Sequence, residues 1–330
     1  MQEHKESLKD SRILVTGGAG AIGSNLCRAL AERGARVTIL DDLSSAARWN
    51  VPDHPNVRFV EGSVVDEQAL KRVFVEPPSL VFHLAALFAN QNSIDHPQDD
   101  LKVNGLGTLL VLQYSRLVGV ERFIYASSGC SVYGKLPVPL REDFNSLDLD
   151  TPYQITKMLG EAYCNFFRNF YDLATVRCRF FNSFGPGEIP GAYRNVIPNF
   201  VHWAMEGKPL PVMGDGTQTR DWTYVGDIVN GLLAAATNDD AVGEAFNLAS
   251  GRETRVIDMA RLVNEIVGNE AGIDFVPMRK WDTKKRLLAS IDKAGELLGY
   301  RPQTAFRQGL EQTVRWFRDN WDLIKRSARF

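Results

Sequence analysis

The sequence has few cysteines, and their arrangement builds no recognisable site. Four cysteines occur in 330 residues, and none forms a C-x-x-C pair. Disulfide-stabilised secreted domains and structural zinc sites need closely or regularly spaced thiols, so neither class is predicted. We therefore expect reduced thiols, no metal centre and a cytoplasmic protein. The positions are Cys27, Cys130, Cys164 and Cys178.

The chain also lacks an excess of charge and any long apolar run. Its formal net charge is -2 at pH 7, which gives no electrostatic attraction to nucleic acid or to an anionic membrane. No stretch is long enough to span a bilayer, and residues 1–6 are too polar for a signal core. We expect neither nucleic acid nor a membrane as a partner. At 44% hydrophobic and 24% charged residues, the composition fits a globular protein with room for two lobes.

A glycine cluster near the start of the chain is the most informative stretch. Residues 13–16 are apolar or β-branched and run into Gly17, Gly20 and Gly23, after which a helical pattern begins. In a strand–turn–helix unit, the first glycine permits a sharp turn and the second lets a pyrophosphate approach the backbone. The third lets the helix pack closely on the strand. Because the positive helix end favours phosphates, the stretch predicts a dinucleotide site.

An acidic pair ends the next predicted strand, which covers residues 36–40. Asp41 stands where a carboxylate accepts the hydroxyls of an adenosine ribose. Asp41 and Asp42 would repel a 2′-phosphate, and no arginine directly follows them. The predicted cofactor is therefore NAD and not NADP.

Strands and helices alternate through the first half of the chain, which predicts an α/β fold with a Rossmann-type, doubly wound parallel sheet. Ligands of such sheets bind at the carboxyl ends of the strands. A composition shift at 185–191 separates an NAD-binding domain over 1–185 from a smaller α/β substrate lobe over 186–330. The segment 223–250 is expected to return to the first sheet. Further predicted strands cover 57–60, 80–86, 123–128, 175–181 and 245–248, and a long helix covers 99–117.

A second pattern lies in the stretch 151–157. Thr151 with Gln154 matches a capping box and Pro152 suits the first helical position, so a helix should begin here. Tyr153 and Lys157 are four residues apart and would share one face of that helix.

This pair has a chemical use beside a dinucleotide loop. A nearby ammonium such as that of Lys157 lowers the pKa of a phenol, so Tyr153 could remove the proton of an alcohol while hydride leaves the carbon. Ser127 and Ser128 end the predicted strand at 123–128. A serine hydroxyl there could donate to the developing alkoxide or ketone, or relay the proton.

Together these motifs resemble the extended short-chain dehydrogenases/reductases, in the NAD-dependent sugar-nucleotide epimerase/dehydratase family typified by UDP-glucose 4-epimerase. The resemblance covers about residues 12 to 315. It rests on the glycine loop 16–23, His83-Leu84-Ala85-Ala86, Asn104 with Gly107-Thr108, Tyr153 with Lys157, Arg179-Phe180-Phe181-Asn182, and the stretch 214–225.

The resemblance implies residue roles. Tyr153 is the acid/base, Ser128 is its hydroxyl partner, and Lys157 also holds the nicotinamide ribose. Arg220 contacts the diphosphate of a nucleotide sugar, and Arg279 competes with Arg286 for a second contact. The implied NAD-binding residues are Gly17, Gly20, Ala21, Ile22, Gly23, Asp41, Asp42, Ser63, Val64, Leu84, Ala85, Ala86, Tyr153 and Lys157. The implied substrate-binding residues are Phe88, Ser128, Asn182, Asn199, Val212, Arg220, Arg279, Asp282 and Arg286.

The loop after Ser128 departs from several members of the family. It reads Gly129-Cys130-Ser131, without the Asp-Glu pair of the 4,6-dehydratases or the glutamate of the UDP-glucuronate decarboxylases. Ser131 is a reserve for the role of Ser128. The lysine of UDP-glucose 4-epimerase is replaced by Phe88, and Ser63 stands where relatives commonly carry an acid.

We interpret the sequence as that of an NAD-dependent nucleotide-sugar epimerase, acting at C4 through a 4-keto intermediate, with a UDP-sugar favoured. The alternatives are a dehydratase or UDP-glucuronate decarboxylase of the same family, a plain alcohol dehydrogenase that releases NADH, and a non-catalytic NAD-binding regulator. Three further expectations concern packing. His83 is structural, and Trp203, Trp222 and Trp281 belong to the core or line a pocket. A homodimer forms through the helices at 99–118 and after Pro152, using Leu109, Leu112, Tyr163 and Phe167.

Overall fold

A computed structural model describes residues 8–144, 146–280, 282 and 284–330. Its centre is a seven-stranded sheet in which every pair of neighbours is parallel. The strand order is β11 (Ala245–Leu248), β6 (Thr175–Phe180), β5 (Arg122–Ser128), β4 (Leu80–His83), β1 (Arg12–Thr16), β2 (Arg36–Asp41) and β3 (Val57–Glu61). The predicted doubly wound, Rossmann-type sheet is thereby confirmed, and the stretch 245–248 forms one of its edges.

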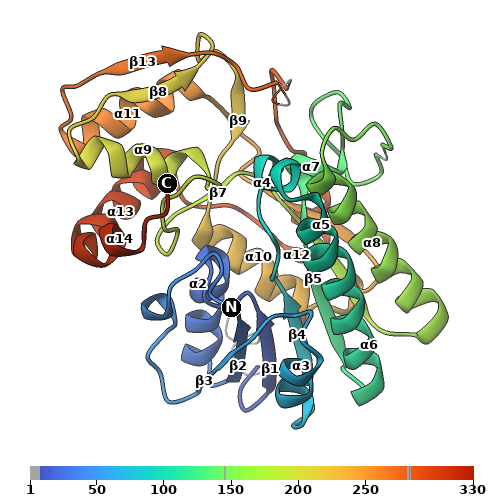
Figure 1. The fold of residues 1–330 in the computed structure, drawn as a ribbon. Helices are drawn as coiled ribbons and strands as arrows, with labels where there is room; N and C mark the ends of the chain where they lie inside the picture. Colours follow the sequence, from blue (N-terminus) through green and yellow to red (C-terminus); the bar gives the residue numbers. More distant parts are fainter. Residues whose placement is uncertain (1–7, 145, 281, 283) are drawn as a thin grey trace.

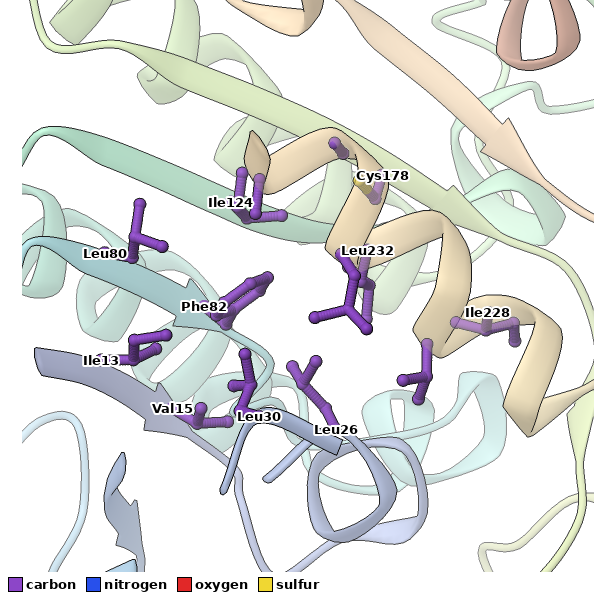
Figure 2. Close-up of a cluster of buried hydrophobic side chains, with 14 of the residues drawn as sticks. Ile13, Val15, Leu26, Leu30, Leu80, Phe82, Ile124, Cys178, Ile228 and Leu232 are labelled. Carbon is purple, nitrogen blue, oxygen red and sulfur yellow. The ribbon is translucent and has the colours of Figure 1, made fainter. Parts of the chain in front are cut away.

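Helices cover both faces of this sheet (Figure 1). One face carries α2 (Ala21–Glu32), α10 (Val225–Thr237) and α12 (Asp292–Leu298), and the other carries α3 (Glu67–Phe74), α6 (Thr108–Val118) and α8 (Pro152–Tyr171). Alternation along β1 explains the two cores, because successive side chains point to opposite faces. Ile13 and Val15 pack with Leu26 and Leu232 in the first core (Figure 2), whereas Leu14 packs in the second.

The second lobe is smaller and has its own core. A parallel pair of strands, β8 (Leu210–Met213) and β13 (Ile273–Val276), lies against α9 (Val196–Met205) and α11 (Val256–Val267). Helices α13 (Phe306–Asp319) and α14 (Trp321–Ser327) complete this layer (Figure 1). Two short pairs complete the strand pairing: β7 (Ser183–Phe184) with β10 (Thr223–Tyr224), and β9 (Thr219–Asp221) with β12 (Glu253–Arg255). The remaining short elements are η1 (Arg48–Asn50), α7 (Gly129–Val132) and η3 (Asp239–Ala241).

The long helix expected at 99–117 is not one regular helix. It divides into α4 (Asn90–Asp95), α5 (Pro97–Asp100), a π-helical turn η2 (Leu101–Gly107) and α6. Within η2 the Asn104 side chain accepts from the Leu87 N–H at 2.7 Å and donates to Asp100 Oδ2 at 2.6 Å. Gly107 lies close to Val64, which a Cβ atom would approach to 2.6 Å. These local contacts favour the wider turn over a regular α-helix.

Two further expectations need correction. The strand predicted at 80–86 ends at His83, so residues 84–86 leave the sheet. Leu112 and Phe167, named for a dimer interface, are buried in the second core at 0% and 2% exposure. Their positions were assigned from apolar periodicity, which identifies the core-facing side of a helix as readily as an interface. None of the helices in the described ranges is long and apolar enough to cross a membrane.

Candidate active site

A large cavity runs along the carboxyl ends of the central strands and into the second lobe. Its lining at the sheet includes Gly17, Gly20, Ala21, Ile22, Gly23, Asp41, Asp42, Ser63, Val64, Leu84, Ala85 and Ala86. Further along lie Phe88, Ser128, Tyr153, Lys157, Asn182, Asn199, Arg220, Arg279 and Asp282. The cavity therefore brings together nearly all the residues that the sequence suggested, from positions up to about 265 residues apart. Across the described ranges, no cluster of three or more His, Cys, Asp or Glu side chains could hold a metal ion.

The glycine loop between β1 and α2 leaves room that side chains would fill. Gly17 has a φ of +71°, and a Cβ atom there would come within 2.6 Å of the Ala85 nitrogen. A Cβ atom on Gly23 would overlap the Gly17 carbonyl oxygen, so only glycine allows α2 to pack against the loop. Helix α2 starts directly after Gly20 with no side chain capping its free N–H groups. Such a helix start binds phosphate, so the loop fits the diphosphate of a dinucleotide.

Asp41 is held at the end of β2 beside this loop. Its two carboxylate oxygens accept from the N–H groups of Ala19 at 3.0 Å and Leu43 at 2.9 Å. Burial raises the pKa of Asp41, while these two backbone hydrogen bonds act in the opposite direction. Asp42 lies beside it and accepts from the Ser44 N–H at 3.0 Å. The arrangement presents a fixed carboxylate to the cavity, as recognition of a ribose requires.

Tyr153 and Lys157 lie on the cavity side of α8, which begins at Pro152. Thr151 caps the helix by accepting from the Gln154 N–H at 3.4 Å. The lysine Nζ donates to the Ala126 carbonyl at 2.9 Å and lies 5.7 Å from the centre of the Tyr153 ring.

The ionisation of the pair differs from the sequence expectation. Burial, followed by repulsion from Asp100, raises the pKa of Tyr153 above its ordinary value, and a hydrogen bond with Ser128 opposes this only in part. Burial also lowers the pKa of Lys157 to about 8. The expected lowering of the phenol pKa is therefore not found for the chain by itself, because desolvation and the nearby Asp100 outweigh the hydrogen bond with Ser128.

The serine loop places several hydroxyls beside this pair. Ser128 ends β5, and its Oγ accepts from Ser131 Oγ at 3.0 Å. Both serines line the cavity. Cys130 lies between them, and burial raises the pKa of its thiol to about 11. Its Sγ donates to Asn182 Oδ1 at 3.4 Å. The thiol therefore remains protonated at neutral pH and is not a carboxylate-like acid or base.

The arginines expected at the diphosphate of a substrate separate into two groups. Arg220 and Arg279 line the cavity, and Arg220 pairs with Asp282 at 2.7 Å. Arg286 does not line it, and its Nε donates to Glu253 at 3.0 Å on the exposed surface. Of the two competing arginines, Arg279 is thus the one placed to meet a ligand in this cavity.

Three other substrate candidates have contacts of their own. The Asn199 side chain donates to the Gly191 carbonyl and accepts from its N–H, at 3.0 and 2.9 Å. Val212 is fully buried and does not line the cavity, although its neighbours Pro211 and Met213 in β8 do. Phe88 packs edge-on against Tyr153, with ring centres 5.8 Å apart.

The structure also tests the expected structural role of His83 and the expected places of the tryptophans. His83 lies between Thr16 Oγ1 at 2.7 Å and Thr108 Oγ1 at 3.0 Å, and burial lowers its pKa to about 3. It is a neutral residue that joins β1, β4 and α6, as predicted. Trp203 and Trp222 line the cavity and also pack in the core of the second lobe. Trp281 lies outside the described residues.

Three charged side chains of the cavity lining, Glu188, Arg194 and Lys284, were missed, and the contacts of the first and the last are informative. Glu188 is 4% exposed, and one of its oxygens accepts from Asn195 at 2.8 Å while the other has no hydrogen-bond partner. Burial raises the pKa of Glu188 to about 7. Lys284 also lines the cavity and donates to the Cys130 carbonyl at 2.7 Å. Neither belongs to a recognisable motif; the only signal for Glu188 was its position directly after Gly185-Pro186-Gly187, which was interpreted as a lobe boundary.

Comparisons with known proteins agree with this geometry. Epimerase Mth375 from Methanothermobacter thermautotrophicus is 57% identical with a TM-score of 0.99, covering 99% of this chain and 98% of that one. A UDP-glucose 4-epimerase from Mycolicibacterium smegmatis is 35% identical over 312 residues, 93% of this chain and 99% of the relative. A UDP-N-acetyl-alpha-D-glucosaminuronate decarboxylase from Bacillus cytotoxicus is 32% identical over 319 residues, 93% of this chain and 98% of the relative.

The comparisons therefore favour no single reaction, but they agree on the family and its cofactor. The model of the NAD dependent epimerase/dehydratase family matches residues 13–249, which include the glycine loop, Asp41 and the Tyr153–Lys157 pair. The residues present fit a dinucleotide, and the cofactor of this chain is NAD. The chain belongs to the NAD dependent epimerase/dehydratase family.

Proposed function

We propose that this protein is a nucleotide-sugar epimerase that inverts C4 through a 4-keto intermediate, with a UDP-sugar as substrate. One observation carries the proposal. The Tyr153 and Ser128 hydroxyls share a cavity with the dinucleotide loop, and the loop after Ser128 brings no carboxylate to them. This machinery suits the oxidation and reduction of a secondary alcohol and offers no second acid for elimination.

In this proposal each residue handles a proton or positions the substrate. Tyr153 takes the proton of the C4 hydroxyl, directly or through Ser128, and returns it when the sugar is reduced. The glycine loop, Asp41 and Lys157 would hold NAD, which would supply the acceptor for the C4 hydride and a positive charge that favours the Tyr153 phenolate against burial. The hydrogen bond from Lys157 Nζ to the Ala126 carbonyl holds the lysine ammonium near the Tyr153 ring. Arg220 and Arg279 hold the diphosphate, because a guanidinium matches phosphate geometry.

The alternatives within the family differ in what they require near C5 and C6 of the sugar. A dehydratase needs an acid and a base at those carbons. Among the described residues, the carboxylates that line the cavity are Asp41, Asp42, Glu188 and Asp282, and none belongs to the serine loop. Asp282 is paired with Arg220. A decarboxylase is less strongly disfavoured, because a 4-keto uronic acid can lose carbon dioxide without a dedicated acid.

Incubation with UDP-sugars in deuterated water tests the reaction. We expect a product of unchanged mass, inverted at C4 and free of deuterium, because the hydride returns to the carbon it left. Deuterium at C5, or a product lighter by water or carbon dioxide, would overturn the epimerase proposal. A steady rise in NADH absorbance would instead support a plain alcohol dehydrogenase, and the absence of any turnover would favour a regulator.

A homodimer is part of the proposal, through the helices first expected but with other apolar side chains than the buried Leu112 and Phe167. Exposed apolar side chains on η2, α6 and α8 include Leu106, Leu117, Phe166 and Phe170, at 46%, 69%, 46% and 69% exposure. Such a patch favours association with a second copy through these helices. Light scattering at micromolar concentration should report a dimer, and Phe170→Glu should give a monomer. Phe275→Glu, at a site in β13 that is 62% exposed, is the control that should leave the dimer intact.

A further inference from the structure

Lys284 is a charged residue of the cavity that the proposed reaction does not use. Its Nζ donates to the carbonyl oxygen of Cys130 at 2.7 Å, so the side chain points toward the loop that follows Ser128. Burial lowers the pKa of Lys284, because the ammonium has exchanged part of its water for protein. An ammonium has three N–H donors, and one carbonyl oxygen satisfies only one of them.

The position of Lys284 is fixed from both sides. Its own carbonyl accepts from Arg220 Nη1 at 3.0 Å, which ties it to the arginine proposed for the diphosphate. Its Nζ contacts Cys130, whose thiol donates to Asn182 and whose neighbour Ser128 adjoins Tyr153. The ammonium therefore lies between the proposed diphosphate contact and the hydroxyls that handle the C4 proton. This is the stretch that the sugar ring must occupy.

The charges around this stretch do not balance. Arg220 already has a carboxylate partner in Asp282 at 2.7 Å. Among the described residues, no carboxylate lies within 4.0 Å of Lys284 Nζ, and Asp150 and Asp282 act on it only from a longer distance. Of the other cavity carboxylates, Asp41 ends β2 and Asp42 directly follows it, near the glycine loop. A positive charge without a close partner thus faces the sugar, and a partly dehydrated charge of this kind is stabilised by an anion.

We propose that Lys284 binds a carboxylate carried by the sugar, so that the substrate is a nucleotide-linked uronic acid and not a neutral hexose. The inference rests on the proposed function, because it takes the diphosphate to lie at Arg220 and C4 to lie at Tyr153. In a hexuronic acid the carboxylate at C6 is attached to C5, next to C4. A carboxylate there can accept the two N–H donors of Lys284 that Cys130 leaves over.

Two simpler roles for Lys284 must be separated from this one. It could bind the diphosphate together with Arg220, or it could only tether the short helix α7 to the second lobe. In either role, replacing Lys284 would change the binding of neutral and acidic nucleotide sugars by the same factor. Selectivity between two sugars that differ only at C6 is therefore the informative measurement.

The test uses the full chain with NAD and compares UDP-glucuronic acid with UDP-glucose by calorimetric binding and by kcat/KM. We expect the unaltered protein to bind UDP-glucuronic acid at least ten-fold more tightly. Lys284→Met should weaken that affinity roughly 30-fold, the usual effect of removing one partner of a desolvated charge pair. The affinity for UDP-glucose should change less than about three-fold. Lys284→Arg keeps the charge and should keep most of the preference. Lys285→Met, at the exposed neighbouring lysine, should behave like the unaltered protein.

The possible failures are distinguishable. The carboxylate proposal is overturned if Lys284→Met weakens the binding of both nucleotide sugars equally, or if the unaltered protein prefers UDP-glucose. The epimerase proposal stands in either case. If neither nucleotide sugar binds, both proposals fail. Should Lys284→Met not fold, the selectivity of the unaltered protein and of Lys284→Arg still decides the question.

Discussion

A buried ion pair beneath the active site gives a prediction whose magnitude follows from its geometry. Arg179 in β6 donates two hydrogen bonds to the Glu161 carboxylate in α8, at 2.8 and 2.7 Å, and both side chains are only 4% exposed. Glu161 also accepts from Ser127 Oγ at 2.5 Å, and Arg179 donates to the Tyr133 hydroxyl at 2.8 Å. The pair thus joins α8, which carries Tyr153, to β5 and β6.

Replacing one partner should cost much more than replacing both. Arg179→Met would leave the Glu161 carboxylate buried without its counter-charge, which typically lowers the free energy of unfolding by about 3–5 kcal/mol. For a chain of 330 residues, the entropy of unfolding is roughly 0.7 kcal/mol/K, so Tm should fall by roughly 4–7 °C. Adding Glu161→Leu removes the unpaired charge and should recover at least half of this loss, because an apolar pair of similar volume is often as stable.

The same pair predicts how stability depends on pH. Burial raises the pKa of Glu161, but the hydrogen bonds and charge of Arg179 outweigh it and leave the pKa below its ordinary value of 4.5. A carboxylate with a depressed pKa stabilises the fold above the unfolded pKa and loses this contribution as pH falls through the folded pKa. The Tm difference between the unaltered protein and Arg179→Met should therefore be full at pH 7 and shrink below pH 4.5.

Calorimetric or circular-dichroism melts of the two single variants and the double variant form a double-mutant cycle. The expected coupling energy is at least about 2 kcal/mol at pH 7. Equal Tm values for Arg179→Met and the double variant would refute the reasoning, because the buried carboxylate would then carry no cost.

Three further predictions concern ligand binding and catalysis. Tyr153→Phe should lower turnover by roughly 10²–10⁴ with nucleotide-sugar affinity retained in calorimetry, since only the ionisable hydroxyl is lost; near-normal turnover would remove Tyr153 from the mechanism. Gly20→Ala should weaken NAD binding more than about ten-fold. It should leave Tm nearly unchanged, because a Cβ atom there would meet the Gly17 oxygen at 3.3 Å, a contact that a small shift relieves. Gly23→Ala should instead lower Tm, and equal Tm values for the two variants would contradict this. Arg220→Ala should cost about 2–4 kcal/mol of nucleotide-sugar binding and leave NAD affinity intact. Unchanged affinity for UDP-glucose would show that the diphosphate lies elsewhere.

The parts of the fold that the sequence predicted are those governed by local patterns. The glycine spacing, the acid after the second strand and the alternation of strands and helices were enough to place Gly17, Asp41 and the central sheet. The π-helical turn at 101–107 was not predictable, because the contacts of the Asn104 side chain with Leu87 and Asp100 leave no periodic pattern in the sequence.

The candidate site was predictable where one motif supplies the residues. Tyr153 and Lys157 follow from their spacing on a helix. Glu188 and Lys284 carry no such pattern, and only the folded chain shows that they reach the cavity. The choice between Arg279 and Arg286 likewise depended on Glu253, which holds Arg286 at the surface.

The order of strands in the sheet has a consequence for dissecting the protein. All residues expected to bind NAD precede residue 185, yet β11, which completes the sheet beside β6, comes from 245–248. Helix α10, which covers β6 and its neighbours, also lies beyond that point (Figure 1). A fragment ending at residue 185 would keep its glycine loop but expose an unpaired strand edge and a bare apolar face. Such edges recruit strands from other chains, so this fragment should aggregate and not act as an isolated nucleotide-binding module.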